Sequence, residues 1–176
     1  GCEVTGVDFA AKTVTARRDG MTLTDSYDKL VIAVGAEPFV PSMPGLDLAG
    51  AFTMRTPDDA AGLRDYITAN HCHNAVVVGG GFIGLEIAEN LRAQGLGVTV
   101  VEAAAQILPG VLDPEMASIA RRQLRQAGIR VLTGAAVSAL GGEGRVESVT
   151  AGGSTLPADV AVLSIGIRPC TGFLAD

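Results

Sequence analysis

The sequence has no tryptophan, only three cysteines and no excess of basic residues. Lys and Arg number 13 against 19 Asp and Glu, which gives a net charge of −6 and a pI near 4.8. Because a phosphate-binding surface needs a basic excess, nucleic acid is not an expected partner. No apolar run approaches the roughly 20 residues that a membrane-spanning helix requires. The first residues also lack the basic and apolar regions of a signal peptide.

The three cysteines, Cys2, Cys72 and Cys170, lie far apart and form no CxxC pair. This pattern indicates neither a disulfide framework nor a zinc site and is typical of a reducing compartment. His71 and His73 flank Cys72, but neighbouring residues of an extended segment point to opposite faces. We therefore expect no metal, and a globular cytoplasmic protein whose 48% hydrophobic residues are ample for a core.

Strand and helix patterns alternate along the chain, which favours an α/β fold. Thr-rich extended patches around Val4, Val14 and Leu23 predict a three-stranded β-meander. The apolar residues 29–34 predict a buried strand that stops at Gly35. The Pro- and Gly-rich stretch that follows has little pattern of its own and is interpreted as a connection.

The pair Thr56-Pro57 predicts the capped start of a helix. Beyond it, the pattern predicts a parallel sheet with strands over 75–78, 98–101, 129–132 and 160–165. Two further helices are expected, one ending before Gly95 and one running from Asp113 to Gly128, with extended pieces near Val137, Val146 and Leu156. The three helices are expected to bury Leu63, Tyr66 and Ile67, then Ile83, Ile87, Ala88 and Leu91, then Met116, Ile119, Ala120, Leu124 and Ala127.

One set of marker residues occurs twice at a single offset. Asp28, Gly35 and Pro38 recur 131 positions later (159 less 28) as Asp159, Gly166 and Pro169. Three short extended pieces precede each set, which indicates a duplicated unit, the alternative being two unrelated meanders. Only the second copy shows a βαβ unit. We therefore expect that of the first copy to precede Gly1, within a longer protein that has two nucleotide-binding units.

A glycine loop directly follows the strand predicted at 75–78. It satisfies G-x-G-x-x-G with Gly79, Gly81 and Gly84, and Gly80, Phe82 and Ile83 complete the loop. The first glycine permits the tight turn, the second lets a pyrophosphate approach the backbone, and the third lets the helix pack closely on the sheet. With a strand before it and a helix after it, the loop indicates a dinucleotide site rather than a ligand-free turn.

Two glutamates complete this pattern. Glu102 ends the second strand, 23 residues after Gly79, where an acid hydrogen-bonds the adenosine ribose. Its carboxylate would repel a 2′-phosphate and residues 103–105 are alanines, so NADH is favoured over NADPH; the alternative is a solvated strand end. Glu86, two residues after Gly84, either favours the helix dipole or lies beside the nicotinamide.

Together these residues resemble the FAD-dependent pyridine nucleotide-disulfide oxidoreductases, most closely the NADH oxidases, NADH peroxidases and coenzyme A-disulfide or persulfide reductases. The matching segments are 27–38, 77–91, 108–110, 112–116 and 163–169. The resemblance implies a Rossmann-like FAD/NAD(P)-binding fold in which an NAD(P)H domain interrupts an FAD domain, followed by a dimerisation domain. It divides this chain into the end of the first FAD-domain segment (1–45), a connection and helix (46–72) and an NAD(H)-binding domain (73–176).

Site roles follow from the same resemblance. Gly79 to Gly84 would hold the NADH pyrophosphate and Glu102 the ribose. Glu86 would approach the nicotinamide carboxamide, and Phe82 would cover the nicotinamide pocket. Two further glycines would lie near the cofactors, Gly166 at the nicotinamide end and Gly35 beside FAD.

The implied chemistry passes hydride from NADH to FAD and then electrons to a cysteine-based disulfide or sulfenate. No cysteine of this chain occupies that redox position, so no catalytic residue is expected here, and Cys170 stands where the family often has Asn. The final acceptor stays open: oxygen, peroxide, a coenzyme A disulfide or a persulfide. Two alternatives remain, a stand-alone NAD-dependent dehydrogenase, which would need a His or Tyr near the nicotinamide, and a non-catalytic NAD-sensing module.

Overall fold

The computed structural model describes residues 1–174. Contacts divide the chain into two compact units, one made of Gly1–Glu37 with Ile167–Asp176, the other of Pro38–Gly166. The chain therefore passes between the units twice. The boundaries 1–45, 46–72 and 73–176 concern the domains of a longer protein and stay a prediction.

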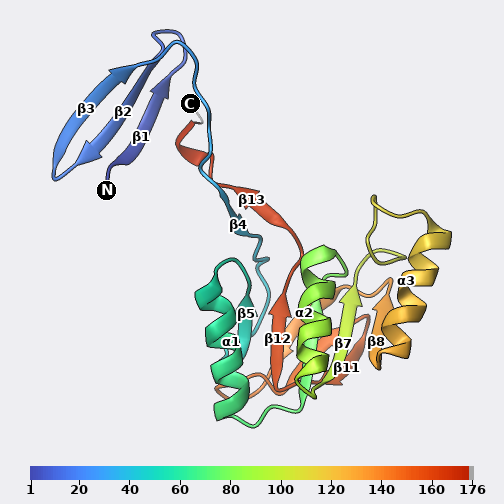
Figure 1. The fold of residues 1–176 in the computed structure, drawn as a ribbon. Coiled ribbons are helices and arrows are strands. Elements are labelled where there is room, and N and C mark those ends of the chain that lie inside the picture. The colour runs from blue at the N-terminus through green and yellow to red at the C-terminus, as the bar shows by residue number, and fades with distance from the viewer. Residues whose placement is uncertain (175–176) are drawn as a thin grey trace. The chain divides into compact units, whose positions relative to one another are not determined.

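The first unit contains the predicted meander. Its strands β1 (Glu3–Asp8), β2 (Thr13–Arg18) and β3 (Met21–Ser26) pair antiparallel in the order β1-β2-β3 (Figure 1). Asp19 and Gly20 both have positive φ, 49° and 78°, in the two-residue turn between β2 and β3. Such turns match the twist of the strands that they join.

The segment 29–34, in contrast, is not the buried strand that its apolar sequence predicts. It forms no strand, and Val31 is 86% exposed. A strand needs a neighbour to receive its main-chain hydrogen bonds, and no strand of the described residues lies against it. The prediction was wrong because it used side-chain hydrophobicity alone.

Two three-residue strands, β4 (Ala36–Pro38) and β13 (Ile167–Pro169), pair with each other. They occupy corresponding positions in the two copies of the repeat. The hydrogen bonds at their ends correspond as well, Phe39 N–H to the Gly166 carbonyl (2.9 Å) and Cys170 N–H to the Gly35 carbonyl (3.0 Å). The 131-residue correspondence therefore holds in the backbone at this point. A 3₁₀ turn, Gly172–Leu174, follows β13.

The second unit contains the parallel sheet. Its order is β5-β12-β6-β7-β8, with β5 at Ala51–Thr53, β6 at Asn74–Val78, β7 at Gly97–Glu102, β8 at Ile129–Thr133 and β12 at Val160–Leu163. The four predicted strands are confirmed. The fifth, β5, lies in the stretch interpreted as a patternless connection; three residues at a sheet edge are too few to show an alternation.

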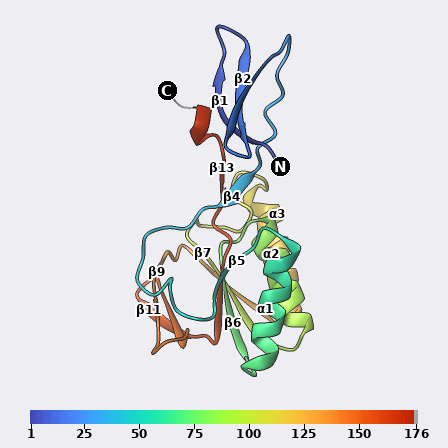
Figure 2. The same cartoon turned by 90° about the vertical axis from the view of Figure 1, so that its left-hand side faces the viewer.

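Helices cover one face of this sheet and a second meander covers the other (Figure 2). The helices are α1 (Pro57–Ala69), α2 (Phe82–Ala93) and α3 (Pro114–Gln126), and the meander strands are β9 (Val137–Gly141), β10 (Ser148–Ala151) and β11 (Ser154–Pro157). Each face has its own apolar core, one beneath the helices and one beneath the meander. A sheet buried on both faces requires continuous apolar strands, which is the pattern of β6 and β12.

Helix α1 begins as the sequence predicts. Thr56 Oγ1 accepts the Asp59 N–H at 3.3 Å, and the Asp59 carboxylate accepts the Thr56 N–H at 2.7 Å. This reciprocal pair is a capping box. The hydrogen bonds from the Thr56 backbone and hydroxyl lower the pKa of Asp59 below its ordinary value. Further along α1, Leu63 and Ile67 are buried as expected.

Two of the helix faces differ from the prediction. Ile83 is 50% exposed in α2, and Met116 and Ile119 are 49% and 41% exposed in α3. The side chains that α3 buries most completely are Ala117 and Leu124. Helical periodicity identifies an apolar stripe, but contact with the sheet selects which part of the stripe is enclosed, and small residues permit the closest approach.

Candidate dinucleotide site

The carboxyl ends of β6, β7 and β12 meet where the strand order reverses. From β6 the chain continues to β7 and β8 on one side, whereas β12 and β5 lie on the other. In open α/β sheets, ligands bind in the crevice at such a switch point. The loops that follow these three strands therefore form the candidate site.

The glycine loop leaves β6 in a conformation that favours glycine. Gly79 has φ of +109°, and its N–H donates to the Val101 carbonyl at 2.8 Å. A Cβ at Gly79 would collide with the carbonyl oxygen of Ser164, and a Cβ at Gly84 with the carbonyl oxygen of Gly79. Both positions press on backbone, so a larger residue at either one forces the loop or the helix to move.

Gly81 differs from these two glycines because it faces open space. A Cβ built there meets no heavy atom within 4 Å. Gly81 is also the N-cap residue of α2, and no side chain caps this helix start. The first N–H groups of a helix have no acceptor within the helix and lie at its positive end, which suits a phosphate. The uncapped helix start and the open space beside it fit a pyrophosphate.

Glu102 is held against the glycine loop by two short hydrogen bonds. Its Oε2 accepts the Gly80 N–H and its Oε1 accepts the Ala104 N–H, each at 2.7 Å. The carboxylate is partly buried and lies at the end of β7. Each carboxylate oxygen can accept a further hydrogen bond, so a ribose hydroxyl can be added to this arrangement. Sequence reasoning located Glu102 but missed that it braces the loop.

The chain after β7 folds back over the glycine loop. The Leu108 N–H donates to the Gly80 carbonyl at 2.8 Å, and Ile107 is 1% exposed. The Ile107 Cγ2 atom would lie only 3.0 Å from a Cβ at Gly80. Gly80 is therefore enclosed on both sides, by Ile107 and by Glu102. The spacing of the motif contains no signal for this contact.

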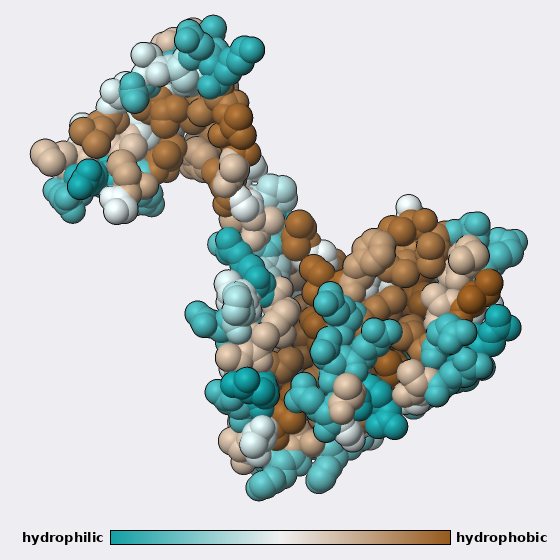
Figure 3. Space-filling model, in the orientation of Figure 1, coloured by the Kyte–Doolittle hydropathy of each residue, from teal (hydrophilic) through white to brown (hydrophobic). Residues whose placement is uncertain are grey.

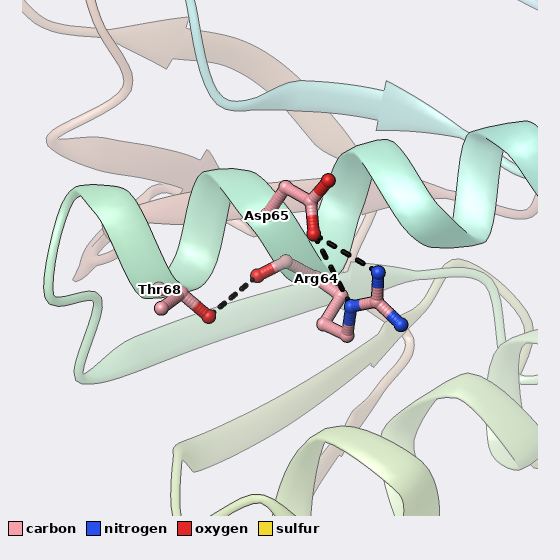
Figure 4. Close-up of polar contacts among 3 residues, drawn as sticks. All are labelled: Arg64, Asp65 and Thr68. Carbon is pink, nitrogen blue, oxygen red and sulfur yellow. Dashed lines mark hydrogen bonds and ion pairs between the residues drawn. The ribbon is translucent and has the colours of Figure 1, made fainter.

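The start of α2 presents the remaining candidate residues. Phe82 is 66% exposed, and on the surface in Figure 3 apolar side chains gather around the start of α2 and the loop before α3, where Val111 is also exposed. Ile83 and Glu86 line a groove between α1 and α2, of about 580 Å³, together with Met54, Pro57, Ala60, Ala61, Leu63, Arg64, Ile67, Ile87, Asn90, Leu91 and Gln94. Arg64 turns its guanidinium to Asp65, at 3.1 Å (Figure 4). The groove therefore keeps a mainly apolar lining.

The loop after β12 adds one residue that the sequence did not indicate. The Ser164 Oγ is buried and has no hydrogen-bond partner within residues 1–174. Gly166, two residues later, has φ of +123° and open space where a Cβ would be. Gly35 belongs to the first unit and is no part of this edge of the sheet.

The histidines and cysteines do not form a second centre. Within residues 1–174 no three His, Cys, Asp or Glu side chains gather as a metal ion requires. Cys72 is buried, and burial raises the pKa of its thiol. None of the helices formed by residues 1–174 has the length and apolar composition of a membrane span.

Comparison with known proteins places this fold in a family. The profile described as "Pyridine nucleotide-disulphide oxidoreductase" matches residues 1–176. The chain belongs to this family. It is 40% identical over 170 residues to an NADH oxidase of Methanocaldococcus jannaschii, covering 95% of this chain and 38% of that protein. It is 38% identical over 170 residues to a benzene 1,2-dioxygenase system ferredoxin–NAD(+) reductase subunit of Pseudomonas putida, covering 96% and 40%.

A solved structure of this pyridine nucleotide-disulphide oxidoreductase family confirms the Rossmann-like α/β fold. The NAD-dependent persulfide reductase from A. fulgidus superposes with a TM-score of 0.85 at 35% identity, covering 98% of this chain and 32% of that one. FAD and NAD(P)H are the cofactors expected for the family. The chain spans about two fifths of the length of the curated relatives described above.

Proposed function

We propose that this chain is the NADH-binding part of a flavin-dependent oxidoreductase and presents the nicotinamide for hydride transfer to FAD. The observation that carries the proposal is the glycine loop with its uncapped helix start and its Gly80 N–H bound by Glu102. When bound, NADH supplies the hydride and becomes NAD⁺, and the parent protein's FAD accepts it. The residues of this chain bind and orient the donor.

The pyrophosphate would lie over Gly81 at the start of α2. The open position of Gly81 leaves room for the phosphate oxygens, and the first N–H groups of the helix would donate to them. Gly79 and Gly84 would act indirectly, since they set the turn and the closeness of helix and sheet. The negative net charge of the chain does not oppose this binding, because the contacts are made by backbone dipoles.

Glu102 would bind the adenosine ribose and select NADH. Its two oxygens are already oriented by main-chain N–H groups, so little ordering is needed when the ribose hydroxyls bind. The 2′-phosphate of NADPH would approach a partly buried carboxylate with no basic residue among positions 103–105. We therefore expect NADH to bind more tightly than NADPH.

The nicotinamide end would lie toward the start of α2 and the loop after β12. Phe82 is exposed there and would cover the ring, while Glu86 would approach the carboxamide. Gly166 has no neighbour at its Cβ position and would let the ring approach the main chain. These three assignments follow the family resemblance and are part of the proposal.

The identity of the electron acceptor is outside the proposal. The relatives named above all carry a nicotinamide nucleotide in their names, but one is named for persulfide and another for ferredoxin. The shared part of these names fits the half of the reaction assigned to this chain. Flavin absorbance in the parent polypeptide would support the oxidoreductase, whereas a colourless parent would contradict it.

The test is to titrate residues 1–176 with NADH and with NADPH and to measure both affinities by calorimetry or nucleotide fluorescence. Gly81→Ala places a methyl group where the pyrophosphate is proposed and meets no protein atom, so the fold is expected to persist. The variant is expected to bind NADH about tenfold to a hundredfold more weakly, through loss of a charge-assisted hydrogen bond.

Gly62→Ala is the matched control, because Gly62 also has open space at its Cβ position but lies on α1, away from the loop. It is expected to bind NADH as the unaltered chain does. Equal NADH affinity of the Gly81→Ala and Gly62→Ala variants would contradict the proposed site, and equal affinity for NADH and NADPH would contradict the role of Glu102.

A further inference from the structure

Positive charge is concentrated in one part of this acidic chain. Residues 116–142 contain four arginines, Arg121, Arg122, Arg125 and Arg130, and no acidic residue. This segment therefore has a charge of +4, and the rest of the chain has a charge of −10 (−6 less +4). We refer to the four residues as the arginine cluster. Such a separation of charge within one molecule produces a local field that attracts anionic groups.

Three of these arginines lie on one side of α3. Around the helix axis, Arg125 is about 40° and Arg122 about 100° from Arg121, since successive residues are about 100° apart. That side faces the outer edge of the parallel sheet, because the Arg121 guanidinium donates to the carbonyl of Val131 in β8 at 3.4 Å. Strand β8 is the last in the sheet order, and Arg130 lies within it (Figure 1). The arginine cluster therefore lies along one edge of the sheet.

The arginine cluster has no acidic partner inside the chain. No carboxylate within residues 1–174 forms an ion pair with any of its members, and Arg122, Arg125 and Arg130 are exposed. Like charges this close on a helix repel each other, and the helix dipole favours only the arginine of the last turn, Arg125. The Nε atom of Arg121 is buried and has no hydrogen-bond partner within the same residues. A buried polar group without a partner is costly, so the cluster indicates an external acceptor.

We propose that the arginine cluster is a docking surface for a second protein that presents a group of carboxylates. Arginine suits this partner, because its planar guanidinium can bind one carboxylate through two hydrogen bonds. A folded protein fits better than nucleic acid or a membrane, since these extended polyanions would also meet the charge of −10 on the rest of the chain (−6 less +4). The arginine cluster contains no residue of the glycine loop, and the proposal is independent of nucleotide binding.

The test measures how a fluorescently labelled peptide of about ten glutamates binds to the full chain, by fluorescence anisotropy. The peptide stands for the carboxylates of the partner, and its affinity is expected to fall as salt is raised from about 10 mM to about 150 mM, where the Debye length is shorter. A variant with Arg122→Gln, Arg125→Gln and Arg130→Gln is expected to bind the peptide at least about tenfold more weakly. These side chains are exposed, so the fold is expected to persist. Binding of duplex DNA or of phosphatidylserine vesicles, without binding of the peptide, would overturn the proposal.

The matched control carries Arg17→Gln, Arg18→Gln and Arg64→Gln. It changes the net charge by the same amount, at exposed arginines outside the arginine cluster. Its affinity for the peptide is expected to stay within about twofold of that of the unaltered chain. Equal losses in the two triple variants would overturn the proposal, because net charge alone would then attract the peptide. Salt-sensitive dimers of the unaltered chain in sedimentation would also overturn it, because the partner would then be a second copy.

Arg121→Met tests the buried guanidinium separately, since methionine keeps an apolar stem and removes the Nε atom. The affinity for the peptide is expected to fall by about tenfold. The urea midpoint is expected to stay unchanged, because the substitution also removes a buried group that has no partner. A variant that unfolds at lower urea and binds the peptide as the unaltered chain does would overturn the role of Arg121 in docking.

Discussion

The two copies of the repeat reach opposite degrees of burial from similar sequences. Every buried hydrophobic side chain of the described residues lies between Leu63 and Leu163, inside the second unit. In the first unit, all six residues of β3 are exposed. Both copies of the repeat nevertheless contain a three-stranded meander, a glycine of positive φ and a short strand that ends in proline. Whether a strand is buried therefore depends on which elements pack beside it, whereas turns and strand directions are set by the local sequence.

The largest expected effect comes from overpacking the contact between α2 and the glycine loop in the second unit. Gly84→Ala places a methyl group against the carbonyl oxygen of Gly79, where α2 meets the glycine loop. We expect the free energy of unfolding to fall by about 3 kcal/mol, the upper range for overpacking. Helical circular dichroism during urea unfolding reports on this unit, because α1, α2 and α3 all lie within it.

Gly62→Ala is the matched control for that substitution. Gly62 is exposed on α1 with open space around it, so alanine is expected to raise stability by up to about 1 kcal/mol through helix propensity. If both alanine variants gained stability, the close approach at Gly84 would not exist in solution.

A second prediction compares equivalent valines directly. Val162→Ala removes two methyl groups from a fully buried side chain, and we expect a loss of about 2 kcal/mol. Val31→Ala at the 86% exposed position is expected to change the stability of residues 1–176 by less than about 0.5 kcal/mol. Urea unfolding of the two variants side by side is the measurement. Similar losses in both would mean that residues 29–34 are buried in solution.

The capping box of α1 is expected to contribute less to the free energy of unfolding than the packing at Gly84 or Val162. Thr56→Ala removes the acceptor of the Asp59 N–H and should lower the free energy of unfolding by about 1 kcal/mol. Thr68→Ala is its control on the same helix, because the Thr68 hydroxyl donates only to the Arg64 carbonyl one turn earlier (Figure 4). A loss at Thr68 as large as that at Thr56 would contradict the role of the cap.

The smallest expected effect is a fall in the free energy of unfolding at alkaline pH. Burial raises the pKa of the Cys72 thiol above its ordinary value of 9.0, so the folded chain keeps a proton that the unfolded chain releases. The free energy of unfolding should therefore fall as the pH rises above 9.0. Burial raises the pKa of Tyr66 above 10.0 and continues the decline.

Substitution separates the thiol from the other titrating groups. Cys72→Ala is expected to flatten the pH dependence just above the ordinary thiol pKa, whereas Cys2→Ala, at an exposed position, should leave the slope as it is. Urea unfolding across that pH range gives the slopes. A slope unchanged by Cys72→Ala would rule out the buried thiol as its source.

Local signals in the sequence were sufficient for much of the fold. The cap at Thr56, the glycine loop and the strands of the second unit depend on residues that are close in sequence, and the structure has all of them. The marker residues Gly35 and Gly166 also correspond in the backbone, since each has positive φ and precedes one of the paired strands β4 and β13. These features could be predicted because each depends on local geometry or on strongly apolar runs.

The features that escaped prediction depend on contacts between distant residues. The exposure of Val31 results from the absence of adjacent strands, and Ile83 is half-exposed because it lines the groove between α1 and α2. The bond from Gly80 to Glu102 joins residues 22 apart through the return of the chain in β7. Composition and periodicity contain no information on such long-range contacts. They did, however, place Gly80 and Glu102 near the same end of the sheet.

That bond has a consequence for how the cofactor preference of such a protein can change. Under the proposed role of Glu102, an arginine in its place would attract a 2′-phosphate, but it would also remove the acceptor of the Gly80 N–H and of the Ala104 N–H. A variant that binds NADPH would therefore first need another support for the loop, from residues 103–108 or from the helix start. The order of the substitutions then matters as much as their identity.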